Sequence, residues 1–155
     1  MTADTENQLT IVRVLDASRA KVWRALREPE ALAQWWGLPD GATMPLCRVD
    51  FRVGGTLHCR IIHDGAEIWF KWIYREIVEG EWLVMEQHFS DAAGRELDSA
   101  ARPVSTITLR LAEADGKTRL TVTQAGMASA VHPVEAYKQG WSESLGRLAD
   151  SLAQS

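Results

Sequence analysis

The side chains that could do chemistry are few, and their spacing matches none of the common catalytic or metal-binding motifs. The histidines and cysteines are His58, His63, His88, His132, Cys47 and Cys59. The cysteines are not in a Cys-x-x-Cys spacing, and strand alternation turns His58 and His88 outward, so we expect solvated or edge histidines and two reduced thiols. The sequence also lacks Gly-x-Ser-x-Gly, a phosphate-binding loop, His-Glu-x-x-His and a dinucleotide fingerprint. We therefore predict no metal, no cofactor and no catalytic residue.

Acid–base catalysis would need a titratable side chain that projects into a pocket. The candidates are Glu76, Tyr74, Tyr137 and His63. Glu76 shares the alternation parity of Tyr74, but it lies near the end of a predicted strand, where we expect a solvated or ion-paired carboxylate. A binding role is therefore favoured, and an enzymatic role stays as an alternative.

The composition is that of one soluble globular domain. The chain has 155 residues, with 17 Lys and Arg against 21 Asp and Glu and a formal charge of −4. No basic stripe is present for a nucleic acid or an anionic membrane, no apolar run is long enough to span a bilayer, and the first ten residues do not resemble a signal peptide. We expect a cytoplasmic monomer or homodimer, with a polar tail over residues 1–8, a single domain over 9–152 and a short tail over 153–155.

Hydrophobic periodicity predicts an α+β fold. Ser18 caps a helix at Arg19–Arg27, and Pro29 precedes a second short helix at Glu30–Trp35. Pairs of an acidic residue and a glycine separate segments in which apolar and polar residues alternate, and this pattern predicts an antiparallel meander. Gly54-Gly55 predicts a bend before the meander. The predicted strands are Leu9–Leu15, Leu57–Ile62, Ile68–Val78, Trp82–Phe89, Ser105–Leu111 and Arg119–Thr123.

A long amphipathic helix is predicted at His132–Leu152. It is the only element long enough to cover the apolar face of the sheet, and Gly140 would let its backbone approach a neighbouring element closely. The expected architecture is a curved antiparallel sheet wrapped around this helix, with the two short helices closing one edge. The polar segment over residues 90–102 shows no pattern, and we interpret it as a flap.

The same alternation identifies an inner face rich in aromatic side chains. One interpretation is an ordinary core in which these residues fill all the space. The other is a pocket for a small, largely apolar molecule, with Gln87, Gln124 and Tyr137 as orienting polar groups. The residues predicted to bind this ligand are Trp36, Phe51, Leu57, Ile61, Phe70, Trp72, Tyr74, Met85, Gln87, Phe89, Tyr137 and Trp141.

A family resemblance covers residues 9–152. It is carried, in order along the chain, by Val22-Trp23-Arg24-Ala25-Leu26, Trp35-Trp36-Gly37, Gly54-Gly55, Tyr74-Arg75-Glu76-Ile77-Val78, Gly116-Lys117-Thr118-Arg119-Leu120-Thr121 and Gly140-Trp141. Together these segments resemble the START-related superfamily and, within it, the family of the activator of heat-shock protein 90 ATPase. The resemblance implies a helix-grip fold that commonly encloses an apolar cavity. Many relatives have a glycine where this chain has Trp72, which implies a small, flat or partly collapsed cavity here.

Three functions follow, in order of preference. The first is non-catalytic binding of a small apolar molecule between the sheet and the C-terminal helix. The second, implied by the family name alone, is a chaperone-regulating or other protein-interaction domain with a part in the stress response. The third is a cyclase- or dehydratase-like enzyme, as found in the wider superfamily.

Overall fold

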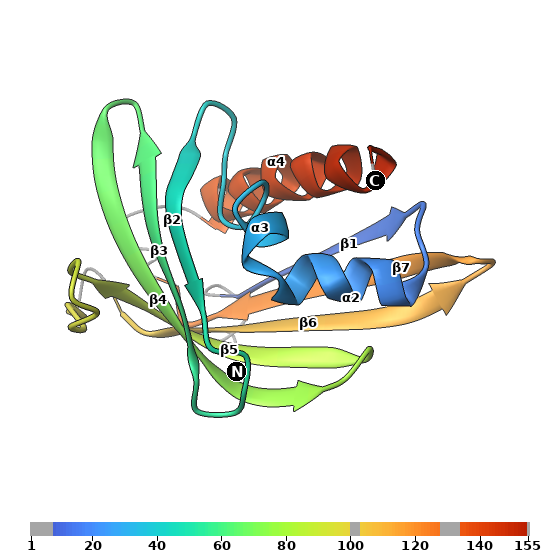
Figure 1. Ribbon diagram of the computed structural model, residues 1–155, viewed down its shortest axis with the longest axis horizontal. Helices are drawn as coiled ribbons and strands as arrows, with labels where there is room; N and C mark the ends of the chain where they lie inside the picture. Colours follow the sequence, from blue (N-terminus) through green and yellow to red (C-terminus); the bar gives the residue numbers. More distant parts are fainter. Residues whose placement is uncertain (1–7, 100–102, 128–133, 155) are drawn as a thin grey trace.

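The computed structural model describes residues 8–99, 103–127 and 134–154. Seven antiparallel strands form one strongly curved sheet in the order β1-β7-β6-β5-β4-β3-β2, and the helices lie on its concave side (Figure 1). The strands are β1 (Gln8–Leu15), β2 (Thr43–Val49), β3 (Thr56–His63), β4 (Ala66–Val78), β5 (Trp82–Ser90), β6 (Ser105–Ala114) and β7 (Lys117–Ala125), and the helices are α2 (Arg19–Arg27), α3 (Pro29–Leu32) and α4 (Val134–Ala153). The predicted architecture, a curved sheet around a long C-terminal helix with two short helices near the N-terminus, is confirmed.

The hairpin turns follow from glycines and aspartates that tolerate positive φ. Asp64 and Gly65 join β3 to β4 with φ of 52° and 76°, and Asp115 and Gly116 join β6 to β7 with φ of 52° and 81°. Two consecutive residues with positive φ give the tight turn whose twist matches that of the paired strands. Between β4 and β5 only Gly80 has positive φ, at 75°, which suits a longer connection.

Strand β2 is absent from the sequence prediction. It lies at the edge of the sheet, pairs with β3 alone, and contains Pro45 where its register shifts. Proline is tolerated at an edge because one side of the strand needs no ladder hydrogen bonds, and this interruption hides the alternation. The predicted bend at Gly54-Gly55 connects β2 to β3, and a Cβ on Gly55 would lie only 2.1 Å from the Asp50 carbonyl oxygen.

The helices bury their apolar faces against the concave side of the sheet. The buried side chains of α4 include Leu145, Leu148 and Leu152, and the Lys21 ammonium of α2 donates to the Leu152 carbonyl at 3.0 Å near the end of α4. Such a cation satisfies a carbonyl that the last helical turn leaves free. No helix in the described ranges combines the length and apolarity that crossing a bilayer requires.

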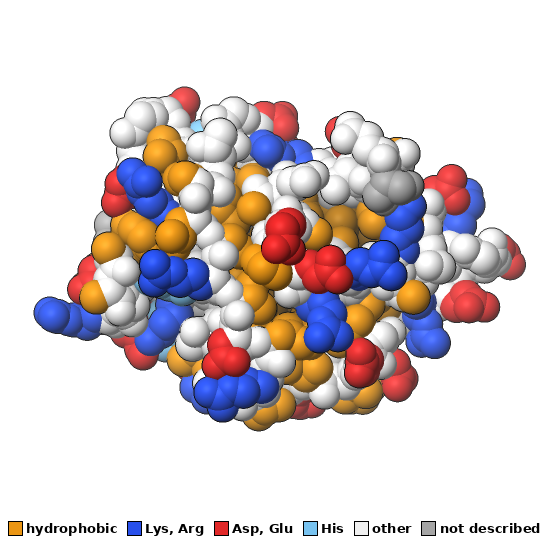
Figure 2. All heavy atoms as spheres, in the orientation of Figure 1, with side chains coloured by type: hydrophobic (Ala, Val, Ile, Leu, Met, Phe, Trp, Pro, Cys, Tyr) orange, Lys and Arg blue, Asp and Glu red, His pale blue; other side chains and the backbone are white. Residues whose placement is uncertain are grey.

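The outward face of α2 is polar. Figure 2 shows acidic and basic side chains interspersed over the face that carries α2 and α3. Exposed ion pairs join Arg24 to Glu28 and Arg27 to Glu79 on this side. On this face the charged side chains are therefore of mixed sign, as expected from the even spread of charge along the sequence.

A bulge in β4 sets the direction in which Glu76 points. The register between β4 and β5 shifts between Tyr74 and Glu76, so Tyr74 faces inward whereas Glu76 is exposed and accepts a hydrogen bond from the Trp82 indole at 3.2 Å. A β-bulge inserts one extra residue and moves the following side chains to the other face. The expectation that Glu76 is a solvated carboxylate, despite the alternation parity it shares with Tyr74, is therefore confirmed.

Residues 91–98 fold back over the outer face of the sheet. Leu97 N–H donates to the Phe89 carbonyl at 2.9 Å, and Ser90 forms an isolated bridge with Glu96. His58 and His88 face outward as predicted, but this segment leaves them only 8% and 4% exposed, so the expectation of solvated or edge histidines is wrong for these two. Within the segment interpreted as a flap, residues 91–98 lie against the outer face of the sheet, and residues 100–102 lie outside the described ranges.

The ends of the predicted domain lie partly outside the described residues. Of the predicted tail over 1–8, only Gln8 is described, and it begins β1. The first two residues of the predicted C-terminal helix, 132 and 133, are likewise not described. At the other end α4 extends to Ala153, so the predicted short tail contributes one residue to the helix.

Candidate functional site

A cavity of about 290 Å³ lies between the concave face of the sheet and the N-terminal half of α4. Its lining consists of Trp36, Gly37, Pro39, Phe70, Trp72, Gln87, Phe89, Ile107, Gln124, Ala136, Tyr137, Gly140, Trp141 and Ser144. Among the described residues, no acidic, basic or histidine side chain contributes to this lining. Gly37 and Ala136 are exposed, so the rim reaches the surface where the loop after α3 meets the start of α4.

Tryptophans from three elements form one wall of the cavity. Trp36 follows α3, Trp72 belongs to β4 and Trp141 belongs to α4. The Trp36 ring meets Trp72 edge-on with centroids 5.5 Å apart and meets Trp141 edge-on at 5.6 Å. Phe70 stacks on Trp72 at 5.3 Å and contacts Phe89 at 4.9 Å. These edge-on and offset contacts are the favoured geometries of aromatic pairs, and they hold the wall in place.

Two glutamines are oriented by the tryptophans. The Trp72 indole donates to Gln87 Oε1 at 3.0 Å, and the Trp141 indole donates to Gln124 Oε1 at 2.8 Å. An indole N–H can only donate, so each amide must turn its oxygen toward the indole and its NH₂ group away from it. Gln124 Nε2 then donates to Ser105 Oγ at 3.0 Å, whereas Gln87 Nε2 has no hydrogen-bond partner among the described residues. The cavity wall thus keeps unused N–H donors.

Helix α4 also holds the loop between α3 and β2, which contributes Trp36 to this wall. Arg147 donates from Nε to the Gln34 carbonyl at 3.0 Å and from Nη1 to the Ala42 carbonyl at 3.1 Å. One turn earlier, Glu143 Oε1 accepts from the Asp40 backbone N–H at 2.9 Å, and this bond lowers the pKa of Glu143 below its usual range. The loop that carries Trp36, Gly37 and Pro39 is thereby fixed at both ends.

The structure divides the predicted ligand-binding residues into two groups. Those that line the cavity are Trp36, Phe70, Trp72, Gln87, Phe89, Tyr137 and Trp141. The others, Phe51, Leu57, Ile61, Tyr74 and Met85, face inward but are not part of its lining; all except Phe51 are almost fully buried.

Beneath α2, inward aromatic side chains pack against one another. Phe51 packs edge-on against Trp23 at 5.9 Å and against Tyr74 at 5.1 Å. Burial raises the pKa of the Tyr74 hydroxyl, which has no hydrogen-bond partner among the described residues. Phe51 and Tyr74 therefore belong to packed core and not to the cavity, because alternation identifies the face of a strand but not the position along it where a helix fills the space.

Several cavity residues are missed by the sequence analysis. They are Gly37, Pro39, Ile107, Ala136, Gly140 and Ser144. Gly140 is predicted to let α4 approach another element, but a Cβ at this position would meet no atom within 4 Å. Because Gly140 has no side chain, open space remains on the helix face that it shares with Ala136, Tyr137 and Ser144. The adjacent Gly140 and Trp141 are the one sequence feature that could have indicated that this turn of α4 lines the cavity.

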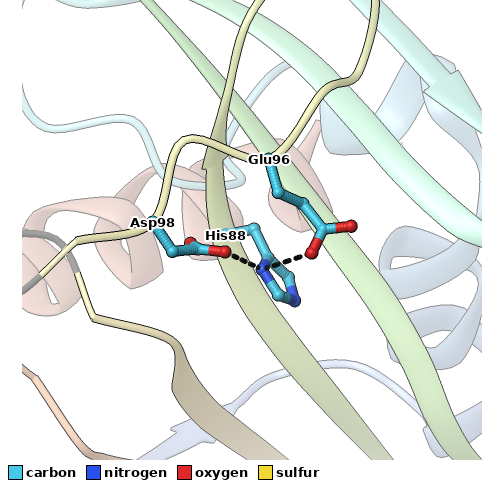
Figure 3. Close-up of side chains that lie close together, drawn as sticks. All are labelled: His88, Glu96 and Asp98. Atoms are coloured by element: carbon cyan, nitrogen blue, oxygen red, sulfur yellow. Dashed lines mark hydrogen bonds and ion pairs between the residues drawn. The ribbon is translucent and has the colours of Figure 1, made fainter.

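A second group of polar side chains lies on the outer face. His88 on β5 is covered by Glu96 and Asp98, which descend from the 91–98 segment (Figure 3). Their ligand atoms lie within 4.8 Å of one another, a spacing that could hold a cation. Both ring nitrogens of His88 are already engaged, however: Nδ1 lies 2.7 Å from Asp98 and Nε2 lies 3.0 Å from Glu86.

Two cations complete this outer-face network. Lys71 pairs with Glu96 at 3.0 Å and Arg75 pairs with Glu86 at 2.9 Å. Burial by itself would lower the pKa of His88, but its hydrogen bonds with Asp98 and Glu86 outweigh burial and raise that pKa above its ordinary value. With His88 protonated, three cations face three carboxylates, so the network is charge-balanced and holds the 91–98 segment onto the sheet.

The fold and the cavity define the class of the protein. A curved antiparallel sheet that wraps around a long C-terminal helix is the START-like helix-grip architecture. Residues 16–153 match the family model described as Activator of Hsp90 ATPase homolog 1-like protein. The chain belongs to this family, as the resemblance of its sequence indicates.

Solved structures agree with this assignment. Protein CV1439 from Chromobacterium violaceum is 32% identical over 94% of this chain and 96% of that chain, with a TM-score of 0.77. Protein NE0264 from Nitrosomonas europaea is 25% identical over 97% of both chains, with a TM-score of 0.81. The AHSA1 protein from Silicibacter pomeroyi shares the fold, at 17% identity over 95% of this chain and 98% of that chain and a TM-score of 0.75. Among curated proteins, none matches this sequence significantly.

Proposed function

We propose that this domain binds a small, neutral, largely apolar molecule in the cavity between the sheet and α4. The observation that carries the proposal is a cavity of about 290 Å³ with an aromatic, uncharged lining among the described residues. An apolar cavity of roughly 150 Å³ holds one benzene ring. A volume about twice as large suits a molecule of one or two fused rings.

The lining also selects for neutral ligands. Moving an ionised carboxylate or ammonium group out of water without a partner costs far more than apolar contacts return. No charged side chain of the described residues lines the cavity to offset this cost. Charged analogues of a ligand are therefore expected to bind much more weakly than the neutral compound.

The polar groups of the wall favour a ligand that carries a hydrogen-bond acceptor. The oxygens of Gln87 and Gln124 are used by indoles, so both amides keep N–H donors. Ser144 lines the same cavity with a hydroxyl that has no hydrogen-bond partner among the described residues. A carbonyl or ether oxygen on an otherwise apolar molecule would use the free Gln87 donors.

Native mass spectrometry of gently purified protein tests the proposal, together with titration of acetylnaphthalene followed by tryptophan fluorescence. We expect a stoichiometric complex in the wild type. A Gly140→Leu variant should lose it, because the new side chain occupies open space in the cavity. The variant should fold at least as stably, since glycine in a helix interior costs roughly 1 kcal/mol.

A Gly146→Leu variant is the matched control. Gly146 also lies in α4, and a Cβ there also meets no atom within 4 Å, but Gly146 does not line the cavity. This variant should bind acetylnaphthalene as the wild type does. Equal binding by the wild type and both variants, or no binding of any neutral bicyclic probe by the wild type, would contradict a ligand site at this cavity.

A further inference from the structure

The two cysteines of the chain face each other across the edge of the sheet. Cys47 of β2 is directly opposite Cys59 of β3, and their sulfur atoms lie 3.9 Å apart. The pairing depends on β2, the strand absent from the sequence prediction. Both thiols are free in this structure.

The strand register places the pair at a site where a disulfide can form. The Asp50 N–H donates to the carbonyl of the opposite residue, Thr56, at 2.8 Å, so this is a hydrogen-bonded pair. Hydrogen-bonded and non-hydrogen-bonded pairs alternate along an antiparallel ladder. Cys47 and Cys59, three positions further along, therefore form a non-hydrogen-bonded pair, whose Cα atoms lie about 4.5 Å apart. This separation lies within the range found for disulfides, so the bond can form without a change in strand register.

The two thiols differ in access and in acidity. Cys47 is half-buried on the edge strand, whereas Cys59 is fully buried. The thiol of Cys59 donates a hydrogen bond to Cys47 that outweighs burial and the charge of Glu30, and the pKa of Cys47 is lowered. The same bond and burial raise the pKa of Cys59. Cys47 is thus the thiol that is both reachable and able to ionise.

We propose that Cys47 and Cys59 form a reversible thiol–disulfide pair that responds to hydrogen peroxide. The Cys47 thiolate attacks one peroxide oxygen, so that an S–O bond forms, the O–O bond breaks, sulfur is oxidised and hydroxide leaves. The sulfur of Cys59 then displaces hydroxide from the Cys47 sulfenic acid, and its proton leaves with that hydroxide as water. The resulting disulfide joins the edge strand β2 covalently to β3.

Thiol counting on the full chain tests this proposal. The protein is treated with hydrogen peroxide, denatured, alkylated with N-ethylmaleimide and weighed intact. We expect two alkylated thiols before oxidation and none after it, a peptide that links residues 47 and 59, and full recovery of both thiols with dithiothreitol. Two thiols that stay alkylatable after peroxide, or dimers linked through Cys47, would overturn the proposal.

Single variants separate the roles of the two sulfurs. Cys59→Ala should accumulate a sulfenic acid at Cys47 that dimedone traps, because the resolving thiol is absent. In Cys47→Ala, hydrogen peroxide should oxidise Cys59 at least about tenfold more slowly than it oxidises Cys47 in Cys59→Ala. Equal rates would show that the assignment of the attacking thiol is wrong, and circular dichroism checks that each variant is folded. Because the linked peptide is measured in the wild type, the proposal can be judged even if the Cys59 variant unfolds.

Discussion

Trp72 decides how much open space remains beneath α4. Its indole is buried, stacks on Phe70, meets Trp36 edge-on and donates to Gln87. A single side chain thus supplies part of the cavity wall and also sets the orientation of the amide next to it. The result is a cavity of about 290 Å³, near the lower end of the ~300–1,000 Å³ typical of small-molecule sites.

Gln87 is expected to discriminate between ligands with and without an acceptor. In the wild type, acetylnaphthalene should bind roughly fivefold more tightly than ethylnaphthalene, because a hydrogen bond contributes about 1 kcal/mol net. A Gln87→Met variant keeps the length of the side chain and removes its N–H donors, so this ratio should fall to about one. Fluorescence titration of both probes measures the ratio.

The comparison of two probes on one variant cancels general effects of the substitution on the cavity. A Gln139→Met variant is the control, because Gln139 is an exposed residue of α4 outside the cavity lining. An unchanged preference for the ketone in Gln87→Met would mean that another group donates to the ketone oxygen, such as the Ser144 hydroxyl or the Trp72 indole, which loses its acceptor in this variant.

At the scale of elements, α4 both packs against the sheet and holds a neighbouring loop by hydrogen bonds. Its apolar side chains close the concave face, while Glu143 and Arg147 bind backbone groups of the loop between α3 and β2. That loop has little regular structure of its own, yet it supplies Trp36, Gly37 and Pro39 to the cavity. The position of this wall therefore depends on polar contacts made from α4.

An Arg147→Met variant is expected to loosen that loop. Methionine preserves much of the apolar stem but removes every donor, which leaves the carbonyls of Gln34 and Ala42 without their partner. Hydrogen bonds from charged groups are worth about 2 kcal/mol each, so the free energy of unfolding in urea should fall by about that amount or more. Hydrogen exchange should also become faster across residues 34–42.

The control for this variant is Arg19→Met. Arg19 is exposed and makes no hydrogen bond or ion pair among the described residues. Its loss should leave the free energy of unfolding within about 0.5 kcal/mol of the wild type and hydrogen exchange across residues 34–42 unchanged. If both variants behave alike, the contacts of Arg147 do not hold the loop.

At the scale of the whole molecule, the two faces of the sheet make different kinds of contact. The concave face packs against α2 and α4 and leaves a cavity, whereas the outer face of β3–β5 carries the 91–98 segment on polar contacts. His88 is central to those contacts, with Glu86, Glu96 and Asp98 around it and Lys71 and Arg75 beyond them. The stability of the fold should therefore depend on the charge of one buried histidine.

This dependence has a definite sign. The folded pKa of His88 lies above its ordinary value of 6.5, so its stabilising contribution is fully present below that value and is lost as the pH rises through the folded pKa. The difference in unfolding free energy between the wild type and a His88→Gln variant should be larger at about pH 6 than at about pH 9. A difference that stays constant or grows with pH in urea titrations would show that His88 is not held protonated by its carboxylates.

Local sequence signals determined the elements and the two faces of this protein. Ser18 as a cap, the Asp-Gly turns and the alternation along the strands act over a few residues, so the curved sheet and the long C-terminal helix could be predicted from them. Tertiary structure alone decided which inward residues border the cavity, because Tyr74 and Trp72 share a face but lie beneath different helices. It also decided the burial of His88 under residues 91–98 and the pairing of Cys47 with Cys59, because both depend on packing between segments whose patterns are interrupted or absent.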